Sequence, residues 1–130
     1  MEEPIWVLDE TVLAIHNRQI AEHGGLAGVR DASALGSALG RPKNKFAYGE
    51  PDTFELAAAY GFGIATNHPF ADGNKRTAFV VSLLFLTLNG FTVEASHDEK
   101  YRTFLDLAAG RLAEADLAVW FKAHCVPVKS

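Results

Sequence analysis

The strongest constraint on the fold is an apolar run over Ala78–Leu88, interrupted only by Ser82 and Thr87. Crossing a bilayer takes about 20 apolar residues, so this run is too short to span one. A segment that is apolar on every side is typical of a helix surrounded by the rest of the protein. We therefore expect a buried central helix from about residue 74 to residue 89, which ends at Gly90.

The remaining sequence shows helical spacing of apolar residues with start and stop signals between the segments. It predicts about six helices, near residues 9–23, 31–41, 53–67, 74–89, 96–110 and 116–124. Asp9, Asp31 and Ser96 are the expected N-caps of three of them, and Pro42 is expected to end the second. Residues 5–8 and 91–94 have extended character, which allows at most a short strand pair. The prediction is an all-α fold in one domain over residues 1–130.

Composition narrows the class of protein without naming a function. The chain has 130 residues, 48% of them hydrophobic and 22% charged, as in ordinary soluble domains. Its formal net charge of −4 gives no general attraction to nucleic acid or to anionic membranes. A single cysteine, Cys125, cannot form an internal disulfide, and the acidic N-terminal segment does not resemble a signal peptide. We therefore expect a cytoplasmic protein that binds neither nucleic acid nor membrane directly.

The most informative segment is His-Pro-Phe-Ala-Asp-Gly-Asn-Lys-Arg-Thr-Ala at residues 68–78, which separates two apolar helices. His68 carries an imidazole, the side chain that most often accepts a proton from a hydroxyl group. Asp72 offers a carboxylate for Mg²⁺. Gly73 allows close approach to the backbone, and the free N–H groups of the following helix favour an anion. Three side chains can add donors to phosphate oxygens: Asn74, Lys75 and Arg76.

Each of these residues also has a structural interpretation. A histidine near a helix end is commonly structural, Asp72 can serve as an N-cap, and Gly73 can serve a turn. Lys75 and Arg76 can be solvated charges, although cations at a helix N-terminus oppose the helix dipole. If the segment were purely structural, all of these interpretations would have to hold at once within residues 68–78. A functional site explains the whole cluster with one cause, so the cluster predicts phosphoryl or nucleotidyl transfer.

This segment resembles the signature of the Fic/Doc superfamily, which runs from a His through Phe, an acidic residue, Gly or Ala, and Asn to an Arg. The Asn-Lys-Arg form resembles the death-on-curing (Doc) branch, the toxins of toxin–antitoxin modules. The resemblance extends to residues 16–31, to Arg41-Pro42 and to residues 109–120. It implies the all-α Fic fold around a buried helix, with Phe70 as a buried wedge that shapes the loop.

The resemblance also implies an activity and its site. The Doc branch transfers the γ-phosphate of ATP, with Mg²⁺, to a Thr of elongation factor Tu and thereby arrests translation. His68, Asp72 and Arg76 would be catalytic, Asp72 would hold Mg²⁺, and the nucleotide phosphates would be bound by Gly73, Asn74, Lys75 and Arg76.

Two alternatives to the kinase stay open. One is a nucleotidyl transferase, but AMP-transferring relatives have Gly where this chain has Lys75 and a second Arg where it has Phe79. The other is a silent module that acts only by binding a partner. The sequence shows no self-inhibitory Ser/Thr-x-x-x-Glu-Gly/Asn helix, so we expect inhibition by another protein. The resemblance implies that this inhibitor is an antitoxin of the Phd type, whose disordered C-terminal segment folds into the toxin's cleft.

Several histidines and cations lie outside the motif. His16 lies on the inward face of the first predicted helix and is expected to be a buried, hydrogen-bonded histidine. No zinc set is completed by His16 and His23, and adjacent helical residues point apart, so His124 and Cys125 are not expected to act as a pair. A loop carrying Lys43, Lys45 and Tyr48 is expected between the second and third helices, where it is either solvated or contacts a partner.

Overall fold

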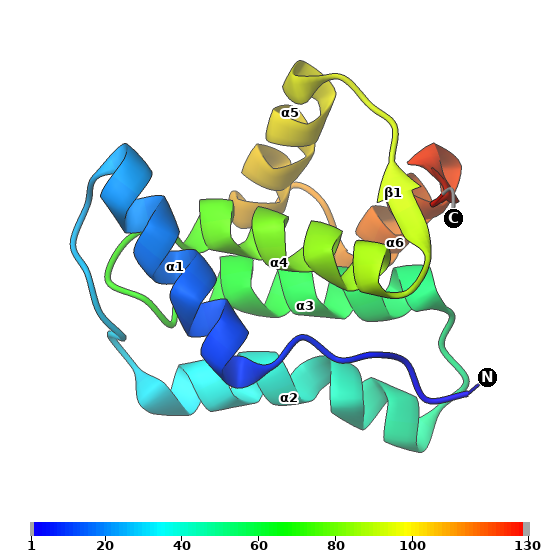
Figure 1. The fold of residues 1–130 in the computed structure, drawn as a ribbon, viewed down its shortest axis with the longest axis horizontal. Coiled ribbons are helices and arrows are strands. Elements are labelled where there is room, and N and C mark those ends of the chain that lie inside the picture. The colour runs from blue at the N-terminus through cyan, green and yellow to red at the C-terminus, as the bar shows by residue number, and fades with distance from the viewer. Residues whose placement is uncertain (1, 129–130) are drawn as a thin grey trace.

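A computed structural model describes residues 2–128 and shows six helices and two short strands in that part of the chain (Figure 1). The helices are α1 (Asp9–His23), α2 (Ala32–Tyr48), α3 (Thr53–Asn67), α4 (Asn74–Leu88), α5 (His97–Ala108) and α6 (Glu114–His124). The strands are β1 (Phe91–Val93) and β2 (Cys125–Pro127), which form one antiparallel pair. This architecture confirms the predicted all-α fold with a short strand pair.

The core is built on α3 and α4, which lie side by side and are joined by the short loop at residues 68–73 (Figure 1). Small residues allow the close approach. A Cβ at Gly61 would lie 2.6 Å from Ser82 Oγ, and that hydroxyl donates to the backbone oxygen of Ala57 at 3.0 Å. Helix α1 packs on α4. Helices α2 and α6 pack on α3, and α5 contacts both α3 and α4. The loop between α3 and α4 is thus anchored by the best-packed pair of helices.

The most enclosed helix is α3 rather than α4. All residues over 56–61 of α3 are buried, whereas Phe79 and Val80 of α4 are only partly buried and Leu88 is 38% exposed. The alanines and glycines of α3 let neighbours approach it from several sides, which a count of apolar residues in α4 does not reveal. The partly open face of α4 borders a cavity described below.

Pro42 does not end the second helix, contrary to the sequence-based prediction. Helix α2 continues to Tyr48, although Pro42 has no N–H to give to the helix. Contacts made beyond the proline favour the continuation. The ring of Phe46 meets Trp6 edge to face at 5.8 Å between centroids, and Lys45 Nζ lies 2.5 Å from Glu114 Oε2. Tertiary contacts thus outweigh the local cost of the proline.

Residues 5–8 do not form a strand, and this prediction was also wrong. The segment is held by side chains instead: Ile5 N–H donates to Asn89 Oδ1 at 2.8 Å, and Val7 N–H donates to the Tyr60 hydroxyl at 3.1 Å. The partner of β1 is β2 at the other end of the chain, with Thr92 opposite Val126. Pairing between segments so distant in sequence leaves no local signal.

Helix caps follow the sequence in two of three cases. Asp31 and Ser96 accept hydrogen bonds from Ala34 N–H and Glu99 N–H, as expected. Asp9 is instead the first residue of α1, where its charge favours the positive end of the helix dipole without capping it.

Candidate active site

The loop that joins α3 to α4, residues 68–73, is called the motif loop here. It begins at His68, which has left-handed backbone geometry with φ 48° and ψ 55°. It ends at Gly73, the N-cap of α4, with φ 79°. A Cβ at Gly73 would lie 3.3 Å from Ile20 Cδ1, so both the dihedral angle and the crowding favour glycine there.

Three side chains fix the shape of the motif loop from within. The ring of Phe70 is 1% exposed and stacks on the imidazole of His16, with centroids 3.8 Å apart. His16 Nε2 is hydrogen-bonded to the backbone oxygen of Asp72 at 2.8 Å. The Asn74 side chain accepts from Phe70 N–H at 2.9 Å and donates to Phe70 O at 3.0 Å. The predicted burial of Phe70 and of His16 is confirmed.

The segment between α1 and α2 runs along the outside of the motif loop. Arg30 N–H donates to Pro69 O at 2.8 Å, and Ala71 N–H donates to Gly28 O at 3.1 Å. At the far end, Leu26 N–H donates to Asp72 Oδ2 at 2.7 Å. Asp72 is therefore not the N-cap of α4, because its carboxylate reaches across to another segment. The motif loop is held between α1 and this outer segment.

The residues predicted from the motif come together around one opening, which we call the motif cavity, with a volume of about 310 Å³. Its lining contains all six predicted site residues together with three alanines: His68, Asp72, Gly73, Asn74, Lys75, Arg76, Ala65, Ala71 and Ala108. Of these, Ala65 and Ala108 were not expected from the sequence, because they come from α3 and α5. The structure thus places a candidate base, a carboxylate and two cations on one small surface.

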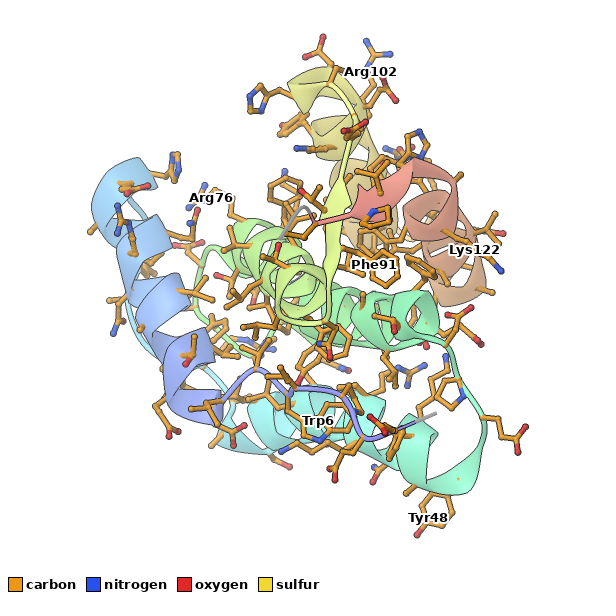
Figure 2. All side chains as sticks on the ribbon, turned by 45° about the vertical axis from the view of Figure 1, so that its right-hand side comes forward. Trp6, Tyr48, Arg76, Phe91, Arg102 and Lys122 are labelled. Carbon is orange, nitrogen blue, oxygen red and sulfur yellow. The ribbon has the colours of Figure 1, made fainter. Side chains whose placement is uncertain are left out.

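Charge at the motif cavity is concentrated where α4 begins. Lys75 Nζ lies 5.0 Å from the centre of the Tyr101 ring, and Arg76 Nη2 donates to Gly24 O at 3.2 Å. Arg76 Nε is buried and has no hydrogen-bond partner among the described residues. Figure 2 shows Arg76 near the end of α4 that faces α1. These cations, together with the free N–H groups of the first turn, fit a phosphate.

The candidate base and carboxylate are accessible. His68 and Asp72 are both exposed, and within residues 2–128 no hydrogen bond or ion pair engages the His68 imidazole. Asn74 differs, because Phe70 uses both polar groups of its side chain. A contact from Asn74 to a phosphate would therefore come from its backbone N–H or from the second hydrogen of Nδ2.

A second opening, the side cavity, adjoins the first and has a volume of about 600 Å³. Lys75 and Arg76 line both cavities. The rest of the side cavity is formed mainly by apolar and aromatic groups of α4 and α5 and by polar residues at its rim: Phe79, Val80, Tyr101, Phe104, Gln19, His23 and His97. It lies where α1, α4 and α5 meet, with its apolar part on α4 and α5.

A metal ion would depend on one protein carboxylate. Within the described residues, no group of three or more His, Cys, Asp or Glu side chains is arranged to hold a metal. Asp72 is the carboxylate of the motif cavity, and one of its oxygens accepts from Leu26 N–H. This arrangement fits Mg²⁺, which usually takes one or two carboxylates and completes its shell with phosphates and water.

The other residues considered from the sequence lie elsewhere. Lys43, Lys45 and Tyr48 belong to α2 and not to a loop, and Lys45 pairs with Glu114. Figure 2 shows Tyr48 projecting from the far end of α2, where it is 90% exposed. Burial raises the pKa of Cys125 to about 11, so its thiol is a poor nucleophile. No helix within residues 2–128 is both long and apolar enough to cross a membrane.

Comparisons with known proteins identify the family of this chain. The model of the Fic/DOC family matches residues 6–86, which contain α1 to α3, the motif loop and most of α4. "Protein kinase doc" of Escherichia phage P1 is 41% identical over 85 residues, which are 65% of this chain and 68% of that protein. "Toxin Doc" of Mycolicibacterium smegmatis is 40% identical over 78 residues, 58% of this chain and 59% of that protein. The chain therefore belongs to the Fic/DOC family.

Proposed function

We propose that this protein is the toxin of a toxin–antitoxin module, and that it transfers the γ-phosphate of ATP to a Thr hydroxyl of elongation factor Tu. The single observation that carries the proposal is the motif cavity, where His68, Asp72 and the two cations of α4 share one opening. The names of the two relatives, a protein kinase and a toxin, support the same activity. Arrest of translation and of growth would follow.

In this proposal His68 takes the proton from the Thr hydroxyl as its oxygen forms a bond to the γ-phosphorus. The bond from that phosphorus to the oxygen between the β and γ phosphates breaks, and ADP leaves. Lys75, Arg76 and the first N–H groups of α4 bind the phosphates and stabilise the charge that develops on them. Asp72 would hold Mg²⁺, which when bound neutralises phosphate charge. Arg76 fits this role because its buried Nε lacks a partner within the described residues.

Transfer of AMP is the less favoured alternative. The position at which AMP-transferring relatives carry a second Arg is Phe79 here, and its ring meets Phe104 edge to face at 5.0 Å. That position therefore offers no cation to a second phosphate. Lys75 stands where those relatives have a small Gly, and its ammonium group lies over Tyr101 at the wall between the two cavities.

Control of the toxin would come from an antitoxin of the Phd type. We place its C-terminal segment in the side cavity, because that cavity is open, largely apolar and bordered by Lys75 and Arg76. A segment bound there would cover the two cations that serve the phosphates. It would therefore block the nucleotide without contacting His68.

The decisive experiment incubates the purified protein with elongation factor Tu and with ATP labelled on either the α or the γ phosphate. We expect label on elongation factor Tu from the γ position only, whereas label from the α position would show nucleotidyl transfer. His68→Ala should reduce transfer by at least about a hundred-fold and abolish growth arrest. His124→Ala is the control, since His124 lies outside both cavities. Growth arrest that persists in the His68 variant would favour a toxin that acts by binding.

A further inference from the structure

The backbone geometry of His68 is unusual and sets the direction of its side chain. Among the described residues, His68 is the only non-glycine residue with a positive φ. Left-handed geometry is unfavourable for residues with a side chain and persists only where surrounding contacts hold it. No hydrogen bond or ion pair within residues 2–128 holds the imidazole itself. The placement of the ring therefore depends on what holds the backbone of His68.

The guanidinium group of Arg30 makes that contact. Its Nε and Nη2 atoms donate to His68 O at 3.0 Å and 2.6 Å, and Nη2 also lies 3.4 Å from Asn67 O. Both carbonyls belong to the C-terminal end of α3, where backbone oxygens lack helical partners and carry the negative end of the helix dipole. A cation with a planar fork of donors suits this position better than a lysine does.

Arg30 is itself fixed at its backbone. Its N–H donates to Pro69 O at 2.8 Å, and the neighbouring Asp31 N–H reaches the same oxygen at 3.1 Å. Beside them, Val29 forms an isolated antiparallel bridge with Phe70. The side chain and the backbone of Arg30 thus bind two consecutive carbonyl oxygens, those of His68 and Pro69.

We propose that Arg30 is a positioning residue that orients His68 for proton transfer. The proposal rests on the proposed function in taking His68 as the base. Arg30 does not line the motif cavity, so it acts through the backbone of His68 and not on the substrate. A general base must lie within hydrogen-bond reach of its proton, and a displacement of about 1 Å can lower a rate on the order of a hundred-fold.

The test compares Arg30→Ala and Arg30→Lys with the unchanged protein, using elongation factor Tu and γ-labelled ATP. We expect Arg30→Ala to lower kcat by roughly ten- to a hundred-fold with less than about a three-fold change in the KM for ATP. Arg30→Lys should recover part of kcat, since an ammonium group reaches one carbonyl. Guanidinium ions at millimolar concentration should partly rescue Arg30→Ala. Arg18→Ala is the control, because Arg18 is an exposed α1 residue that pairs with Glu22 on the same helix.

A second measurement separates this proposal from the proposed function. The imidazole resonances of His68, assigned by their loss in His68→Ala, are followed by NMR in the absence of substrate. We expect them to shift or broaden in Arg30→Ala and to stay in place in Arg18→Ala. Unchanged resonances, or a fall in kcat that only matches a fall in the folded fraction, would overturn the role of Arg30. Absence of transfer by the unchanged protein would count against the proposed function alone.

Discussion

The side chain of Asn74 offers a sharp test of how the motif loop is held. Asn74→Ala removes two hydrogen bonds to Phe70, at 2.9 Å and 3.0 Å, without touching either cation of α4. Each such bond contributes about 0.5–1.5 kcal/mol, so we expect the free energy of unfolding to fall by about 1–3 kcal/mol. Asn74→Asp keeps the acceptor for Phe70 N–H but sets a carboxylate against Phe70 O, and should not restore stability.

The chain supplies a matched control in Asn89, at the other end of α4. The Asn89 side chain also joins two backbone segments. It accepts from Ile5 N–H at 2.8 Å, and it donates to Ile5 O at 2.9 Å and to Phe85 O at 2.8 Å. Asn89→Ala removes three such bonds and should therefore cost at least as much free energy, about 1.5–4.5 kcal/mol by urea unfolding, while phosphate transfer stays near normal. Asn74→Ala should lose transfer well beyond its loss of folded protein. A stability cost below about 0.5 kcal/mol for Asn74→Ala would refute the inference that the Asn74 side chain holds the motif loop.

Three further predictions concern single side chains. Gly73→Ala should lower the free energy of unfolding by about 1–2 kcal/mol more than Gly110→Ala does. Both glycines have φ near 79°, but of the two only Gly73 has neighbours that would crowd a Cβ. Equal costs in urea unfolding would contradict this prediction. Tyr101→Ala should raise the KM for ATP two- to five-fold, since its cation–π contact with Lys75 is worth about 0.5–1 kcal/mol. Tyr101→Phe keeps an aromatic ring and should match the original protein. An unchanged KM in both variants would show that Tyr101 does not contribute to the site. Burial raises the pKa of Tyr60 to about 12 from 10, so between pH 10 and 12 only the unfolded state loses this proton, and the free energy of unfolding should fall by up to about 3 kcal/mol as the pH rises. Tyr60→Phe should flatten that part of the stability profile, whereas Tyr48→Phe, at an exposed position, should leave it unchanged. Identical profiles for Tyr60→Phe and the original protein would exclude Tyr60 as the cause.

Local signals predicted most of this fold because helix boundaries are set by nearby residues. The start of α3 at Thr53, its end at Asn67 and the start of α4 at Asn74 follow from caps, glycines and Pro69, and the structure agrees with them. The six residues expected at the site also share one cavity, since they lie on one short loop and the first turn that follows it. Proximity in sequence here guarantees proximity in space.

Features that depend on distant segments were not predictable in the same way. The continuation of α2 past Pro42 depends on Glu114 and Trp6, which approach only after folding. The hold of Arg30 on His68 joins positions 38 apart in the chain, and Tyr101 reaches Lys75 from another helix. The sequence around Pro42 or Arg30 does not show whether such a distant contact forms. Local rules therefore fail where a tertiary contact outweighs the local preference.

The contrast between two pairs of cations argues that the motif cavity is built for an anion. Arg41 and Lys45 of α2 both pair with Glu114, whose side chain is 10% exposed, so each of these cations has a carboxylate partner within the fold. Lys75 and Arg76 have no carboxylate within ion-pair distance among the described residues, and the first turn of α4 carries no acidic residue. Two cations at the positive end of a helix dipole repel it and each other. This repulsion lowers the stability of the fold slightly, and a bound phosphate group would relieve it.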